Sequence, residues 1–181
     1  SVEELVKEIE KRLDELVREI EKTNKKVEDD IRKMLEDIKR VHDKSNEDLE
    51  KLVKELREKL KDEKRLEEIT RRVEKMKRDN NEVLKELEER VRRILEHHRR
   101  LSDRVREEAE DIRRRLRELL ERGLDLKDIE KVARDILRRV KKILEENRKH
   151  AEKARRELEK LLRESKRLVD ELLRRAEEEK R

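Results

Sequence analysis

Four histidines and a few serines are the side chains of this chain best suited to chemistry. Cysteine is absent, which removes thiol nucleophiles and thiolate metal ligands. A serine nucleophile needs a neighbouring base, and Ser45 follows His42 by three residues, about one helical turn. A helix interior, however, offers no free amide hydrogen to stabilise an oxyanion. We therefore expect no catalytic residues and no enzymatic activity.

A metal centre would need several ligands that converge. Helical bundles that bind two metal ions place a glutamate three residues before a histidine, and no histidine of this chain has that spacing. Glu146 precedes His150 by four residues, which is a weak signal. His97 is adjacent to His98, so it points about 100° away around a helix and is expected to face water. The sequence predicts neither a metal site nor a cofactor.

Charge is abundant but balanced. Charged residues make up 60% of the chain, and 57 basic residues nearly cancel 52 acidic ones, for a net charge of +5. The two signs are interspersed, which is typical of a solvated surface. There is no aromatic residue to stack on bases, a single glycine, and no apolar run near the roughly 18 residues of a membrane span. We expect no nucleic acid, membrane or small-molecule substrate as a partner, and a soluble chain that would be cytoplasmic on recombinant expression.

Apolar residues recur at alternating steps of three and four, the pattern of a left-handed coiled coil. The pattern is sustained in three stretches that begin at Val2, Leu66 and Leu126. Strand-like alternation is absent from the sequence. The composition, rich in Glu, Lys, Arg and Leu with this period, also favours long helices over disorder.

Two breaks divide the pattern. Gly123 can adopt the left-handed conformation that ends a helix, and Asp125 can cap the next one. The other break is weaker: a turn across Lys61–Arg65, with Asp62 as the cap, keeps Glu63 out of the apolar stripe. We predict helices at about 2–61, 64–122 and 126–180, folded into one domain over 1–181.

The predicted fold class is all-α, a long antiparallel up-down-up three-helix bundle that resembles a coiled-coil rod of roughly 80–90 Å. A competing interpretation cuts the chain into eight short helices, and Ser45 with Asp48 does resemble a capping box. The heptad phase passes through each polar interruption without a slip, which favours the long helices.

Uncharged polar residues are scarce, and several replace apolar residues of the stripe. An antiparallel turn pairs positions whose residue numbers have a constant sum, about 126 for the first turn and about 245 for the second. With these sums, the uncharged polar residues align in two layers. Asn24 then faces Ser102, and His98 faces Asn147, with Thr23 alongside. The second layer contains His42, Ser45, Asn80, Asn81 and Ser165, with Ser45 facing the asparagines and His42 close by. We predict two buried polar networks, formed by Asn24, His98, Ser102 and Asn147, and by His42, Ser45, Asn80 and Ser165.

A buried polar group without a partner costs about 1–3 kcal/mol. A layer that joins three helices lets each group find a partner, and it opposes shifted packings in which polar groups would face leucine and isoleucine. The layers therefore predict specificity of packing more than stability. A buried neutral histidine would also make the packing sensitive to acid.

The chain resembles de novo designed helical bundles that carry buried hydrogen-bond networks. The resemblance covers the whole chain and depends on the aliphatic core, the Glu/Lys/Arg surface, the Gly123–Asp125 loop and the polar layers. It implies a structural scaffold without natural activity, or an interaction module that self-associates or accepts a further helix, with histidines that can make packing pH-responsive. The first turn lacks the glycine that such loops often carry. Natural spectrin-like repeats typically use a core tryptophan, which this chain lacks.

The sequence leaves two functions open, a monomeric scaffold and an interaction module. Little more than two apolar residues per heptad suffice for three helices that face one another, which favours a monomer. Adjacent apolar pairs such as Leu16–Val17 and Ile136–Leu137 widen the stripe and keep the interaction module open.

Overall fold

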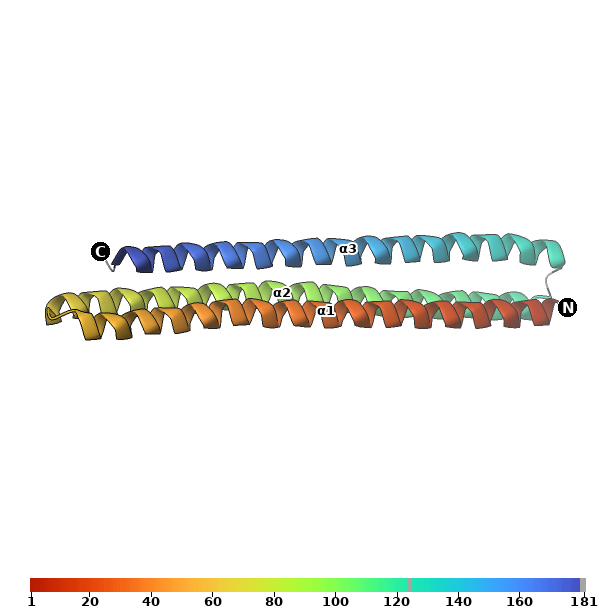
Figure 1. The fold of residues 1–181 in the computed structure, drawn as a ribbon. Helices are drawn as coiled ribbons and strands as arrows, with labels where there is room; N and C mark the ends of the chain where they lie inside the picture. The colour runs from red at the N-terminus through yellow and green to blue at the C-terminus, as the bar shows by residue number, and fades with distance from the viewer. Residues whose placement is uncertain (124, 180–181) are drawn as a thin grey trace. The chain divides into compact units, whose positions relative to one another are not determined.

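The computed structural model describes residues 1–123 and 125–179, and three long helices account for nearly all of them (Figure 1). These are α1 (Val2–Lys59), α2 (Glu63–Glu121) and α3 (Leu126–Glu179). The described residues contain no strand, and the predicted all-α three-helix class is confirmed. The first two helices end one or two residues before the predicted bounds. Leu124 and residue 180, which the prediction placed in the loop and at the end of the third helix, lie outside the described residues.

α1 passes through Ser45 as an uninterrupted helix of 58 residues. The eight-helix interpretation is therefore wrong. The reason is that Ser45 is buried in the packing face of the helix, with 1% of its surface exposed, and does not act as a cap.

The first turn is short and is closed by an aspartate cap. The last α1 carbonyls are partly satisfied by a bond from the amide of Leu60 to the oxygen of Leu56. Asp62 Oδ1 accepts hydrogen bonds from the backbone amides of Lys64 at 3.1 Å and Arg65 at 3.4 Å. An N-cap aspartate satisfies amide hydrogens that no helical carbonyl can reach. The predicted role of Asp62 is confirmed, without any glycine in this turn.

The second turn uses the glycine that the sequence offers. Gly123 has a φ of +66°, the left-handed conformation in which a side chain is strained. Its amide donates to the oxygen of Leu120 at 3.2 Å. Asp125 Oδ1 then accepts from the amide of Asp128 at 3.2 Å and begins α3. Both predicted roles, the glycine stop and the aspartate start, are confirmed.

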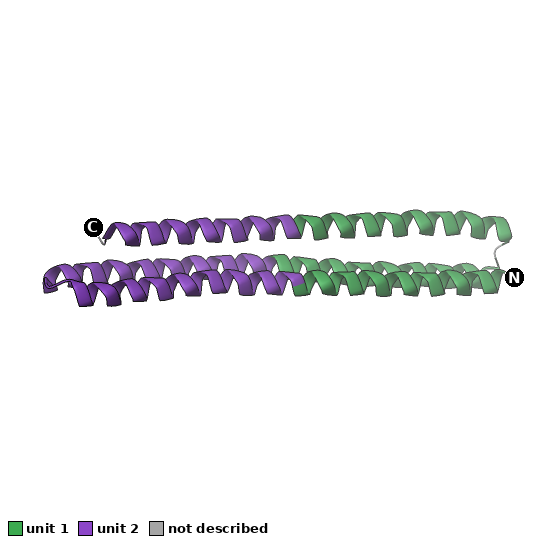
Figure 2. Ribbon diagram, viewed as in Figure 1, with its two compact units in different colours: residues 1–29, 94–154 green, residues 30–93, 155–181 purple. Residues whose placement is uncertain are grey.

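Two compact units divide the chain, and each contains a segment of all three helices (Figure 2). Unit 1 comprises Ser1–Asp29 and Ile94–Ala154, and unit 2 comprises Asp30–Arg93 and Arg155–Arg181. The organisation of 1–181 as one domain stays a prediction.

Unit 1 has an aliphatic core formed by Val6, Leu13, Ala109, Ile112 and Leu116, against which α3 packs through partly buried residues such as Ile136. Ion pairs between α1 and α2 flank this core. The pairs are Glu10 with Arg117, Asp14 with Arg113, Glu21 with Arg106, and Glu28 with Arg99. In each pair the two residue numbers have the same sum, so the two segments are antiparallel and in one constant register.

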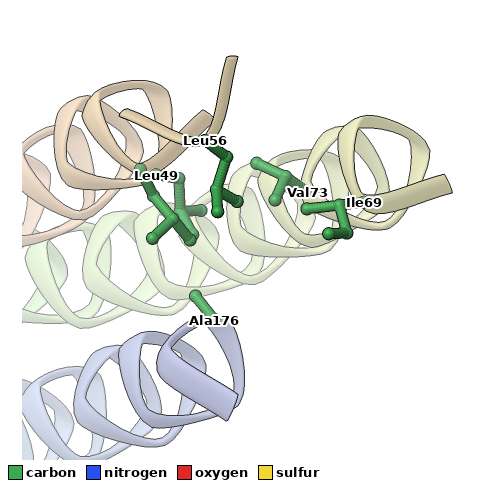
Figure 3. Close-up of a cluster of buried hydrophobic side chains, with 6 residues drawn as sticks. Leu49, Leu56, Ile69, Val73 and Ala176 are labelled. Carbon is green, nitrogen blue, oxygen red and sulfur yellow. The ribbon is translucent and has the colours of Figure 1, made fainter. Parts of the chain in front are cut away.

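Unit 2 buries a comparable cluster in which all three helices take part. Leu49, Leu52 and Leu56 of α1 meet Ile69 and Val73 of α2 and Ala176 of α3 (Figure 3). Lys77 pairs with Glu50 at 2.8 Å, in the same antiparallel register of α1 and α2 that unit 1 shows. Arg155 pairs with Asp30 at 3.4 Å, consistent with α3 running parallel to α1. Each unit is thus a three-helix bundle.

In the described part of the chain, no helix is both long and apolar enough to cross a membrane.

Candidate functional site: two buried polar layers

The first buried polar layer lies in unit 1, and Asn24 is at its centre. We call Asn24, His98, Ser102 and Asn147 the Asn24 layer; three of them are buried and Ser102 is half-buried. Asn24 Nδ2 donates to Ser102 Oγ at 2.7 Å, and Asn24 Oδ1 accepts from Asn147 Nδ2 at 3.0 Å. The side chain of Asn24 therefore joins α1 to both other helices.

His98 bonds to the backbone of Asn24, whereas the sequence analysis predicted that it faces Asn147. Its Nε2 lies 3.3 Å from the carbonyl oxygen of Asn24. A carbonyl only accepts, so Nε2 carries the hydrogen and Nδ1 of the neutral ring is a bare acceptor. That Nδ1 atom and Asn147 Oδ1 are both buried without a hydrogen-bond partner. Part of this layer is therefore unsatisfied.

The pKa of His98 is lowered from its ordinary value of 6.5, and burial away from water is the main cause. The hydrogen bond to Asn24 and the carboxylate of Glu28 act in the opposite direction, while the nearby His97 and His150 lower the pKa further. Desolvation penalises the charged imidazolium, and here it outweighs the groups that favour charge. Burial thus favours the neutral form of His98.

The second buried polar layer lies in unit 2, and His42 is at its centre. We call His42, Asn46, Asn80, Asn81 and Ser165 the His42 layer; His42, Asn80 and Ser165 are buried, Asn46 is half-buried and Asn81 is exposed. The ring of His42 is fully buried, with Nδ1 at 2.6 Å from Asn80 Oδ1 and Nε2 at 2.6 Å from Ser165 Oγ. One imidazole therefore bridges from α1 to α2 on one side and to α3 on the other.

Hydrogen-bond directions in the His42 layer follow from which atoms can only accept. Asn80 Nδ2 donates to the carbonyl oxygen of His42 at 3.1 Å and to Asn46 Oδ1 at 2.9 Å, which uses both of its hydrogens. Asn46 Nδ2 donates in turn to Asn81 Oδ1 at 2.9 Å. Asn80 Oδ1 must accept, so His42 Nδ1 donates, and the neutral ring then accepts the Ser165 hydroxyl hydrogen at Nε2. The layer is a directed chain of donors and acceptors.

Several polar residues take roles that the sequence did not predict. Ser45 is buried, but its Oγ has no hydrogen-bond partner, although it was expected to face Asn80 and Asn81. Thr23 bonds to the oxygen of Glu19 on its own helix. Asn46 was missed; its spacing of four residues from His42, one turn along the same helical face, was the signal that could have identified it.

Ser165, His42 and Asn80 have the order and the hydrogen-bond distances of a nucleophile, a base and an orienting amide. The sequence analysis paired Ser45 with His42, whereas in the structure the serine bonded to His42 is Ser165. Ser165 and His42 are both 0% exposed, so no substrate reaches the hydroxyl. The helices around them have their amide hydrogens bonded within the helix, which leaves none to stabilise an oxyanion.

One histidine pair was also missed. His97 of α2 and His150 of α3 contact edge to face, with ring centroids 5.7 Å apart and planes inclined by 72°. His97 is exposed and His150 is half-buried, so this pair lies at the surface of unit 1. Within residues 1–123 and 125–179, no group of three or more histidine, cysteine or acidic residues is arranged to hold a metal ion.

Comparison with known proteins gives no match to a family, to a curated protein or to a solved structure.

The two buried serines of unit 2 form a matched pair for mutation. Ser165→Ala removes the partner of His42 Nε2 and should lower the free energy of unfolding by about 1–2 kcal/mol. Ser45→Ala removes a hydroxyl that has no partner, so it should leave stability unchanged or raise it. Denaturant midpoints for the parent and both variants measure the difference. Equal losses in the two variants would contradict the hydrogen-bond assignment.

The lowered pKa of His98 predicts an acid-sensitive contribution to stability. Below pH 6.5 the unfolded chain binds a proton at this position before the folded chain does. The contribution is fully present above pH 6.5 and decreases as pH falls through 6.5 to the lower folded pKa. Denaturant midpoints between pH 7.5 and 4.5 should therefore fall more steeply for the parent than for His98→Asn. His97→Asn, which changes an exposed ring, is the control and should keep most of the parent's slope.

Proposed function

We propose that this chain is a designed structural scaffold, without natural biochemical activity, whose helix packing is specified by its two buried polar layers. The observation that carries the proposal is that each unit buries one layer and that each layer hydrogen-bonds across all three helices. In unit 1 the links are Asn24 to Ser102 and to Asn147. In unit 2 they are His42 to Asn80 and to Ser165.

Energetics support a role in specificity. Each neutral hydrogen bond contributes about 0.5–1.5 kcal/mol net, whereas a buried group that loses its partner costs about 1–3 kcal/mol. A layer adds little to the free energy of unfolding of the native arrangement. It destabilises a slipped arrangement more strongly, because Asn24 or His42 would then face leucine or isoleucine. The difference between native and slipped packings is therefore larger than the stability that the layer adds.

The proposal assigns the chain no catalysis. The Ser165–His42–Asn80 contact that resembles a catalytic triad is better explained as packing, because it is closed to solvent. Its hydrogen bonds satisfy side chains that would otherwise be unpaired. The aliphatic core, the charged surface and the aspartate caps at Asp62 and Asp125 further support a designed origin. We likewise propose that nucleic acids and small-molecule substrates are not partners.

Removing both layers tests the proposal. The layer-free variant combines Asn24→Leu/His98→Leu/Ser102→Ala/Asn147→Leu with His42→Leu/Asn80→Leu/Ser165→Ala. It should be at least as stable as the parent to denaturant, but its register should no longer be unique. The chain has no cysteine, so spin labels at Arg18→Cys and Lys142→Cys, both exposed positions of unit 1, report only the distance between α1 and α3. A slip of one heptad moves a helix by about 10 Å. We expect one narrow distance distribution for the labelled parent and a broad or split one for the layer-free variant.

A control for this experiment is Ile20→Leu, which changes the core beside the layer and leaves the polar residues intact. It should keep the narrow distribution. An equally narrow distribution for the layer-free variant would overturn the proposed role of the layer, whatever its stability.

An interaction module is the second candidate function, and exposed leucines favour it. Leu126, Leu137 and Leu144 of α3 are exposed by 61%, 55% and 36% of their surface, and Leu5 of α1 by 38%. All four belong to unit 1. Unit 1 also has a pocket of about 280 Å³ between α2 and α3, with Ile112 and Ile136 among its lining residues. A second copy or an additional amphipathic helix would bury these groups.

Light scattering coupled to size-exclusion chromatography separates the two functions. The scaffold predicts a mass near 22.4 kDa at micromolar concentration, and a larger mass would favour self-association. Leu137→Glu/Leu144→Glu should leave the mass of a scaffold unchanged but should convert an oligomer to the monomer. As a control, Lys141→Glu/Lys142→Glu adds negative charge at nearby exposed positions without removing a leucine.

A further inference from the structure

The surface histidine pair of unit 1 can do more than pack. His97 and His150 come from two different helices, and their ring centroids are 5.7 Å apart. The hydrogen-bond network of the Asn24 layer does not include either ring. His97 is exposed and His150 is half-buried, so water and ions can reach both rings.

The separation of the rings is compatible with a shared metal ion. A zinc ion binds an imidazole nitrogen at about 2.0–2.1 Å, and that nitrogen lies about 1.2 Å from the ring centroid. Two imidazoles on one tetrahedral ion thus have centroids about 5 Å apart. The observed 5.7 Å is larger by less than an ångström, which a small rotation of the exposed His97 side chain covers.

Imidazole is a ligand that suits late divalent transition metals, with affinity rising toward Cu²⁺. Magnesium and calcium prefer oxygen ligands and are not expected here. Glu146 lies one turn before His150 and lines the same small pocket, but the described residues form no cluster of three ligands. Water molecules would complete the coordination of an ion held by two rings.

We propose that His97 and His150 form a two-ligand site for a divalent transition-metal ion such as Ni²⁺, Cu²⁺ or Zn²⁺, which links α2 to α3 at the surface of unit 1. This site is independent of the scaffold function and would exist whether or not the polar layers specify the packing. Because the folded chain holds the two rings together and the unfolded chain does not, a bound ion stabilises the folded state.

The test uses the full chain without a polyhistidine tag at pH 7.5, with Ni²⁺ as the probe. Calorimetric titration of the parent should show one equivalent of bound Ni²⁺, and the denaturant midpoint should rise as Ni²⁺ is added. His97→Asn and His150→Asn should each weaken binding by about tenfold or more, because loss of a ligand costs at least as much as loss of a group that orients one. Both variants should also lose the rise in the midpoint.

A matched control keeps the number of histidines. Glu96→His/His97→Asn moves the α2 histidine by one residue, which turns it by about 100° around the helix and away from His150. This variant should bind Ni²⁺ as weakly as His97→Asn does. The proposal is overturned if the parent shows no rise in midpoint with Ni²⁺, or if the moved histidine binds as tightly as the parent. It is also overturned if His98→Asn abolishes binding while His97→Asn does not, since the ion would then lie in the buried layer.

Discussion

A polar side chain that is taken out of water must find a partner, and much of the packing of this protein depends on that constraint. Aliphatic side chains at heptad spacing bring three helices together, but leucine and isoleucine contacts are nearly the same after a shift of one heptad. Asn24 and His42 remove that ambiguity because their partners lie at one level only. Three of the ion pairs between α1 and α2, those of Asp14, Glu21 and Glu28, follow one another at seven-residue steps. Such pairs tolerate solvent, so they are consistent with the register but impose it weakly.

The constraint is not met everywhere, and the exceptions show how the layers work. His98 Nδ1, Asn147 Oδ1 and Ser45 Oγ are buried without partners. His98 and Asn147 belong to the Asn24 layer, and Ser45 lies one helical turn from His42, so these unpaired atoms are close to the contacts that specify the packing. The lowered pKa of His98 has the same origin, because a ring that is removed from water and has one unpaired nitrogen resists a second proton.

The sequence predicts the fold closely because the fold depends on local rules. Heptad spacing identifies the helices, and Gly123, Asp125 and Asp62 mark their ends through backbone conformation and capping, which involve only nearby residues. The polar layers could be located by pairing residues across the turns, since a seam position must be buried. Their bonds could not be assigned in this way, because a partner depends on rotamers and on the angle around each helix. His42 was expected at the edge of its layer and lies at its centre. The His97–His150 contact was missed because the pairing across the turns was applied only to residues on or beside the apolar stripe.

The directed hydrogen bonds of the His42 layer have a consequence for handedness. Three similar helices in up-down-up order can be arranged so that the third lies on either side of the first two, and a purely aliphatic core packs almost equally well both ways. The two nitrogens of His42 are not equivalent: Nδ1 donates to α2 and Nε2 accepts from α3. Exchanging the sides would require the other tautomer, and it would bring α2 to Nε2 at the far end of the ring and α3 to Nδ1 beside the Cγ that joins the ring to α1. The unequal reach of the two ring nitrogens therefore distinguishes two topologies between which a purely aliphatic core discriminates little.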